Sequence, residues 1–119
     1  MRNIFIFCLL YVIISVPALA ADWLPNFEDV PKMERTFVVE DGGFVFSTGD
    51  LRIIETTVIS GEVTRRQFQR FYSDAMAELG WRRIENSRTL QVFVRGYDRL
   101  RIEIVSDRPL EARFIIAPR

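Results

Sequence analysis

Two glutamates are the side chains of this sequence that come closest to a catalytic pair. Glu55 and Glu103 could in principle act as acid and base in glycoside cleavage, which needs two carboxyl groups facing one bond. Both lie in segments that alternate like surface strands, and no apolar pocket surrounds either in the sequence. We therefore expect these carboxylates to be structural.

The residue types that the chain lacks exclude several other kinds of catalytic and metal site. The chain of 119 residues has no His, and its single Cys, Cys8, lies in an N-terminal apolar run. A Ser-His-Asp triad and most zinc sites are thereby excluded. Glycine-rich phosphate loops are absent, and the acids around Gly42 and Asp50 lack the spacing of a calcium loop. We predict a protein that is not an enzyme and that uses no cofactor or metal.

The N-terminus has the pattern of a signal peptide. Arg2 precedes an apolar run over residues 4–16, and Ala18-Leu19-Ala20 supplies the small residues of a cleavage site. An uncleaved anchor is the alternative, but the run is shorter than the roughly 20 residues that a membrane-spanning helix needs. We expect residues 1–20 to be removed, which leaves no stable membrane anchor. Export then places the protein in the periplasm of a Gram-negative bacterium, with secretion as the alternative.

The formal net charge of the chain is zero, but acidic and basic residues are unevenly distributed along the sequence. Residues 22–55 hold eight acids and three bases, whereas residues 56–119 hold eight acids and twelve bases. Opposite signs on adjoining segments suggest that the first packs over the second. Because an exported protein of balanced charge has little reason to meet nucleic acid, we expect Arg65, Arg66 and Arg70 to form a solvated helix face.

Hydrophobic periodicity predicts one α+β domain over residues 36–119, preceded by an extended lead-in segment over residues 21–35. Strands are expected at 36–39, 44–46, 51–60, 82–85, 90–95, 100–105 and 110–116. Thr64 and Gln67 fit a capping box that begins a helix, and Gly80 fits its end. The predicted architecture has two layers, with the amphipathic helix on one face of an antiparallel sheet. Its minimal order is ββαβββ, with room for extra short strands.

Alternation along the last strands predicts which residues lie on the sheet face away from the helix. This candidate interaction face mixes charges with apolar side chains: Phe93, Arg95, Arg101, Glu103, Val105, Arg113 and Ile115, together with Gln91 and Glu111. Either the lead-in segment packs across it, or it docks a partner protein of the envelope. A partner could also add a strand to a free sheet edge.

A small-ligand site is the second hypothesis. Tyr72 on the helix and Trp81 just after it could line a pocket between helix and sheet. A core anchor at this corner is the competing interpretation of Trp81.

Several motifs resemble a group of short exported proteins of unknown function from alphaproteobacteria. The motifs are Asp29-Val30-Pro31-Lys32-Met33, Phe44-Val45-Phe46 followed by Gly49-x-x-Arg52-Ile53-x-Glu55, Phe71-Tyr72, Leu79-Gly80-Trp81 and Leu100-Arg101-Ile102-Glu103. They cover most of the chain after residue 20, and Ala77 stands where those proteins often have Pro. The resemblance implies export and residence in the envelope, and it implies no catalytic residues.

Overall fold

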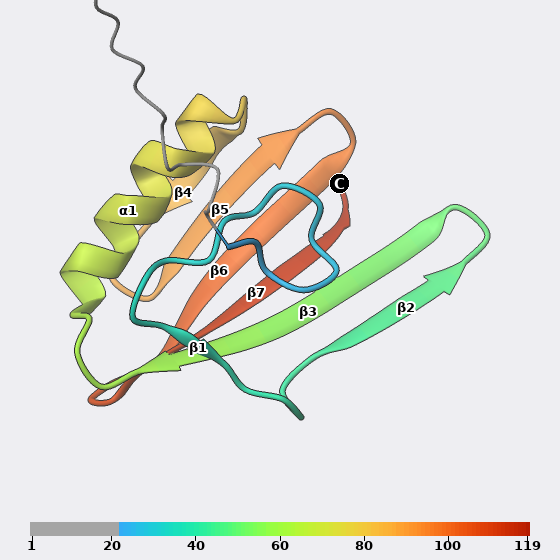
Figure 1. Ribbon diagram of the computed structural model, residues 1–119. Helices are drawn as coiled ribbons and strands as arrows, with labels where there is room; N and C mark the ends of the chain where they lie inside the picture. Colours follow the sequence, from blue (N-terminus) through green and yellow to red (C-terminus); the bar gives the residue numbers. More distant parts are fainter. Residues whose placement is uncertain (1–21) are drawn as a thin grey trace, which may run out of the picture.

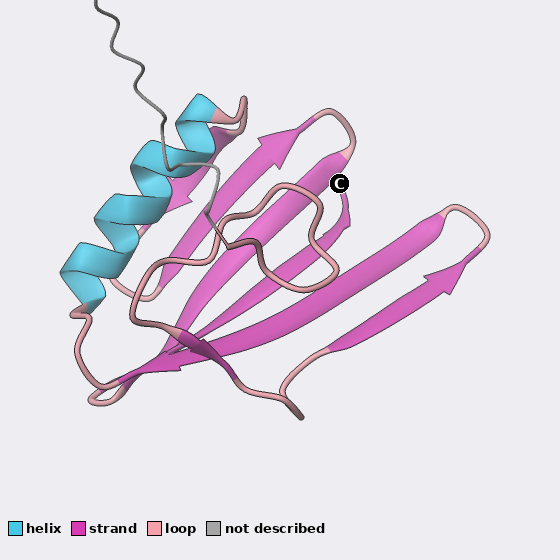
Figure 2. Ribbon diagram, viewed as in Figure 1, coloured by secondary structure: helices cyan, strands magenta, loops and turns pink. Residues whose placement is uncertain are grey.

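Runs of β-branched and aromatic residues form seven antiparallel strands, and one amphipathic segment forms a helix. The structure is a computed structural model that describes residues 22–119, so the predicted signal peptide lies outside the described residues. The fold belongs to the α+β class (Figures 1 and 2). In chain order the elements are β1 (Phe37–Val38), β2 (Phe44–Thr48), β3 (Leu51–Ser60), α1 (Arg65–Glu78), β4 (Arg82–Asn86), β5 (Leu90–Arg95), β6 (Asp98–Asp107) and β7 (Leu110–Pro118).

The observed order βββαββββ contains more strands than the minimal order ββαβββ. Across the sheet the strands follow β1-β3-β7-β6-β5-β4, and β2 also pairs with β3. Both β1 and β2 use the same edge of β3, because β7 occupies the other edge. Strand β1 pairs near Ile59, and β2 pairs with residues 51–55.

Local sequence signals define both ends of α1. The N–H of Gln67 donates to Thr64 Oγ1 at 3.1 Å, and the N–H of Thr64 donates to Gln67 Oε1 at 3.0 Å. At the other end, Gly80 has a φ of +91°, and the N–H of Trp81 donates to the Met76 carbonyl at 2.9 Å. These bonds satisfy backbone groups that a helix end leaves unpaired, so both predicted boundaries are confirmed.

The lead-in segment lies on the same face of the sheet as α1. On β7, the Phe114 ring lies 5.0 Å from Tyr72 of α1 and 6.4 Å from Phe27 of the segment, measured between ring centroids. Leu24 and Val30 are also buried in this core. The alternative in which the segment covers the face away from the helix is therefore wrong, and a single helix does not have to cover the sheet alone (Figure 1).

Hydrogen bonds fix the lead-in segment to the domain. The Tyr72 hydroxyl donates to the Pro31 carbonyl at 2.7 Å and accepts from the N–H of Met33 at 3.1 Å. The Ser60 hydroxyl donates to the Arg35 carbonyl at 2.7 Å. Burial of Tyr72 raises the pKa of its hydroxyl, which keeps the donor neutral.

Candidate interaction site

The hairpin of β2 and β3 extends beyond the rest of the sheet (Figure 1). Its turn is Gly49-Asp50, in which Gly49 adopts a φ of +56° that favours glycine in a two-residue hairpin turn. Strand β7 joins β3 only from Ile54 onward. The tip of the hairpin therefore has no neighbouring strand on either side among the described residues.

Apolar side chains on the hairpin remain accessible. Phe44 is 52% exposed and Phe46 is 48% exposed, and both lie on the sheet face away from α1, which we call the open face. Val45 points to the opposite face and is also about half exposed. Leu51 pairs with Thr48 next to the turn and is exposed on the same face as Phe46. Aromatic and aliphatic side chains grouped in this way are typical of protein-binding surfaces.

The free edge of β2 differs sharply from the other edge of the sheet. Strand β4 carries Arg82, Arg83 and Glu85 and has a bulge between Arg83 and Glu85. Charges and bulges are the devices that prevent an edge strand from pairing with other chains. In contrast, β2 has the sequence Phe-Val-Phe-Ser-Thr, without a charge, a proline or a register shift. This edge is open to a further strand.

The backbone of β2 is also anchored tightly to β3, its one neighbouring strand within residues 22–119. A Cβ at Gly43 would collide with the carbonyl oxygen of Glu55 on β3, so only glycine allows this approach at the start of β2. Acidic residues flank the strand on both sides, with Glu40 and Asp41 before it and Asp50 after it. Between residues 40 and 52 the sequence has these three acids and one base, Arg52, so negative charge predominates in the residues that flank β2.

A ladder of ion pairs occupies the centre of the open face. Arg113 on β7 lies 3.5 Å from Glu55 and 3.3 Å from Glu103, measured between nitrogen and oxygen atoms. Arg101 pairs with the second oxygen of Glu103 at 2.9 Å. Three residues of the candidate interaction face, Arg101, Glu103 and Arg113, therefore lie on the open face as predicted, and they engage one another.

The remaining apolar residues of that candidate face have different environments. Ile115 aligns with Glu55 and Arg101 in the sheet register and so also belongs to the open face, where it is half-buried. Val105 is exposed at a bulge between Ile104 and Ser106 of β6. Ile115 lies in the same cross-strand row as Phe44, but Glu55 stands between them. Val105 lies near the opposite end of the sheet, so the apolar surface is divided rather than continuous.

On β5 the predicted assignment of faces is wrong. Phe93 is only 1% exposed and belongs to the core on the helix side. Gln91 is buried as well, and its side-chain nitrogen donates to the Gln69 carbonyl at 3.1 Å and to the Ser73 hydroxyl at 2.9 Å. The neighbouring Val92 and Val94 instead face the open side, where arginines are their cross-strand neighbours.

Arg95 is another residue of β5 that lies on the helix side rather than on the open face. Its guanidinium carbon lies 4.4 Å from the centre of the Trp81 ring, and its Nη1 donates to the Leu79 carbonyl at 3.0 Å. The same nitrogen lies 2.6 Å from Asp29 in the lead-in segment. Arg95 thus joins the end of α1 to that segment and is a structural residue.

The predicted pocket between Tyr72 and Trp81 is filled by protein. Tyr72 is fully buried between Phe68 and Phe71, and Trp81 is 4% exposed under Arg95. The hollow beside Trp81 measures about 110 Å³. Small-molecule sites usually occupy about 300–1,000 Å³, so this space is too small for the proposed ligand role.

Neither a metal centre nor a similar known protein offers another site. Within residues 22–119, no group of three or more His, Cys, Asp or Glu side chains could hold a metal ion, and no helix is both long and apolar enough to cross a membrane. No family model, curated protein or solved structure matches this chain. The hairpin of β2 and β3, which the sequence pattern predicts only as two strands and a turn, groups four exposed apolar side chains: Phe44, Val45, Phe46 and Leu51.

Proposed function

We propose that this protein is a non-catalytic interaction module that binds an extended strand of a partner protein along β2. The observation that carries this proposal is an edge strand without charges or bulges whose apolar side chains are half exposed. Stable proteins usually protect such edges, as this protein does at β4. An unprotected edge is therefore best explained by a binding role.

Strand addition uses backbone groups that β3 does not reach. In a two-residue hairpin the residues next to the turn, Thr48 and Leu51, form a hydrogen-bonded pair, and the pairing type then alternates. It follows that Val45 and Ser47 direct their N–H and C=O groups away from β3. These groups are free to form a ladder with a partner strand, while alternate side chains of that strand pack against Phe44 and Phe46.

Charge complementarity indicates the chemistry of the partner. Glu40 and Asp41 precede β2 and Asp50 follows it, so a bound strand has acids beyond both of its ends. Two copies pairing through β2 would place these acids near each other, whichever direction the strands run. We propose instead a partner segment with alternating apolar residues and Lys or Arg on its flanks.

The absence of catalysis is part of the proposal. The chain has no His, and both carboxylates considered for glycoside cleavage, Glu55 and Glu103, contact the guanidinium of Arg113 on the half-exposed open face. This arrangement supports a structural role for the two acids. The guanidinium of Arg113 contacts both acids, where a glycosidic bond would have to lie between them.

Export is also proposed, on the basis of the sequence of residues 1–20 and the resemblance to exported alphaproteobacterial proteins. The partner would then be an envelope protein of the periplasm, with release from the cell as the alternative. Mass spectrometry of the protein from its source tests this directly. A mature N-terminus at Ala21 supports export, and a retained Met1 in a cytoplasmic fraction contradicts it.

A displayed library of random twelve-residue peptides tests strand binding while the natural partner is still unidentified. Bound peptides are expected to alternate apolar and polar residues and to carry Lys or Arg near their ends. Ser47→Pro removes one outward N–H from the exposed edge, and Ser47→Ala is the matched control that keeps it. We expect selected peptides to bind Ser47→Pro at least tenfold more weakly than the wild type and to bind Ser47→Ala normally.

Two results of the peptide selection would contradict strand binding along β2. The proposal fails if no peptide is enriched, or if enriched peptides bind both Ser47 variants equally well. Sedimentation of the protein alone distinguishes the remaining alternative. A dimer that dissociates in Ser47→Pro but not in Ser47→Ala would identify a second copy as the occupant of the edge and would contradict a separate partner.

A further inference from the structure

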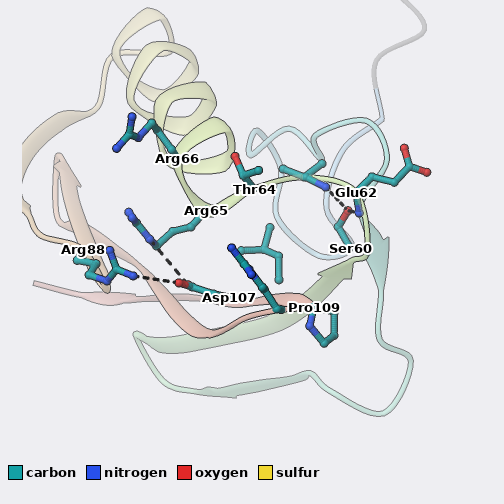
Figure 3. Close-up of a pocket in the computed structure, with 12 residues that line it drawn as sticks. Ser60, Glu62, Thr64, Arg65, Arg66, Arg88, Asp107 and Pro109 are labelled. Carbon is teal, nitrogen blue, oxygen red and sulfur yellow. Dashed lines mark hydrogen bonds and ion pairs between the residues drawn. The ribbon is translucent and has the colours of Figure 1, made fainter.

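A second surface, at the opposite end of β3 from the hairpin tip, gathers arginines from three parts of the chain. A pocket of about 610 Å³ lies between the start of α1 and the turn that joins β6 to β7 (Figure 3). Arg65 and Arg66 begin the helix, Arg88 lies between β4 and β5, and Arg108 lies in the β6–β7 turn. The sequence separates these residues by up to 43 positions, counted from 65 to 108, so only the fold brings them together.

One carboxylate lies among these arginines. Arg88 Nη2 lies 3.2 Å from one oxygen of Asp107, and Arg65 Nε lies 3.8 Å from the other. Figure 3 marks both ion pairs with dashed lines and shows Glu62, the other acid of the pocket, pointing away from Arg65 and Arg88. The Nη1 atom of Arg65 donates to Gln69 Oε1 at 3.0 Å. Asp107 therefore shows that the pocket suits an anionic oxygen group.

Positive charge in the pocket exceeds what Asp107 balances. Among the described residues, neither Arg66 nor Arg108 has a carboxylate within 4.0 Å. Arg65 Nε is buried and has no hydrogen-bond partner within residues 22–119. An adjoining hollow of about 500 Å³ shares Arg65, Arg66 and Arg88 and adds Arg70, which extends the basic surface.

The arginines at the start of α1 also oppose the helix dipole. Cations in the first turn of a helix are unfavourable, and α1 has no acid there to offset Arg65 and Arg66. The capping box already occupies the amides of Thr64 and Gln67, so the positive surface is made by side chains rather than by the helix end itself. Such an arrangement costs stability unless an anion binds.

We propose that this arginine pocket binds a phosphoryl group. The planar guanidinium matches the oxygens of a phosphate with paired hydrogen bonds, and several converging arginines favour a group with more than one negative charge. The volume is sufficient for a small phosphorylated molecule or for a lipid headgroup. Arg66 and Arg70 are exposed, as expected for a solvated helix face, whereas Arg65 is partly buried. The proposal adds a ligand to this face because the fold brings Arg88 and Arg108 beside it.

The test follows the Arg65 Nε–H resonance by NMR during titration at 150 mM salt. Pyrophosphate is the soluble probe, and vesicles of phosphatidylcholine with and without phosphatidylglycerol are the lipid probe. The double variant Arg66→Gln/Arg108→Gln removes two exposed charges from the pocket. Its matched control, Arg52→Gln/Arg99→Gln, removes two exposed charges at the far ends of β3 and β6.

Each outcome decides the proposal. Saturable pyrophosphate binding that weakens at least tenfold in the pocket variant, but not in the control, supports the site and identifies a soluble phosphate. The same loss seen only with phosphatidylglycerol vesicles supports the site and identifies a lipid headgroup. No saturable binding of either probe, or equal binding by both double variants, overturns it.

Discussion

The two ends of β3 differ in how much protein surrounds them. From Ile54 to Ser60 the strand lies next to β7, under the core built by α1 and the lead-in segment, and several of its side chains are buried. From Leu51 to Ile53 it pairs with β2 alone and lies outside that core. Both halves are rich in good strand-forming residues. The difference shows that apolar residues are buried at one end and exposed at the other, where we propose that a partner strand binds.

The largest contrast is expected between two phenylalanines. Phe93→Ala removes a fully buried ring from the core and is expected to lower the free energy of unfolding by about 3–5 kcal/mol. Phe46→Ala, on the half-exposed hairpin, is expected to cost less than about 1 kcal/mol because part of the ring already contacts water. Urea unfolding measures both. Equal losses would contradict the division of β3 into a core end and a binding end.

The burial of Tyr72 in the core predicts a pH dependence of stability. Tyr72→Phe removes two hydrogen bonds to the lead-in segment and should cost about 1–3 kcal/mol at pH 7. Burial raises the pKa of Tyr72 above the value of about 10 in the unfolded chain, so its contribution is complete below pH 10 and is lost as the pH rises further. The stability difference between wild type and Tyr72→Phe should therefore shrink above pH 10.

Tyr97 provides the control for this measurement. It is 90% exposed on the β5–β6 turn, so Tyr97→Phe should preserve the stability of the wild type and its decline above pH 10. Denaturant unfolding at several pH values between 7 and 11 compares the three proteins. A decline that persists unchanged in Tyr72→Phe would show that another group causes it.

A smaller contrast concerns two threonines. Thr64→Ala removes the cap of α1 and should destabilise the protein by about 1 kcal/mol. Thr48→Ala changes an exposed residue of the hairpin and should shift the unfolding free energy by less than about 0.5 kcal/mol. Thermal unfolding followed by circular dichroism resolves the difference. A larger effect at Thr48 would mean that the hairpin contributes more to stability than its exposure indicates.

The smallest expected effect is on the open face. Glu103→Gln weakens both of the ion pairs that Glu103 forms, with Arg101 and Arg113, and partly exposed pairs of this kind contribute about 0–1 kcal/mol each. The loss should decrease further in 1 M salt, where such charges are screened. Urea unfolding at low and high salt tests this. A loss above about 2 kcal/mol at both salt concentrations would show that the ladder is a core element rather than a surface feature.

Local signals made the helix and most strands predictable. The capping box at Thr64 and Gln67 and the glycine at position 80 act within one turn of the chain, so the sequence alone contains them. The faces of β5 were not predictable in the same way. Val92 and Val94 alternate with Phe93, so both faces of the strand are apolar and alternation cannot distinguish them. Contacts with residues distant in the sequence determine which face of β5 lies against the core.

Those contacts come from α1 and the lead-in segment. Gln91 bonds to the helix backbone, and Arg95 contacts Trp81 and Asp29, which fixes the orientation of β5. The candidate sites depend on topology for the same reason. Whether β2 has a neighbour, and whether Arg88 lies near Arg108, is determined by the strand order and not by any local pattern. The uncharged composition of β2 was the one signal in the sequence that could have identified its edge.

Hydrogen exchange at individual β2 amides, with and without a selected peptide, tests strand addition most directly. Because Val45 and Ser47 direct their N–H groups outward, peptide binding should slow their exchange at least tenfold. Phe44 and Phe46 already donate to β3 and should change little. This alternating protection along β2 is the predicted result. Uniform protection, or protection confined to other strands, would contradict the proposal that this edge binds a partner strand.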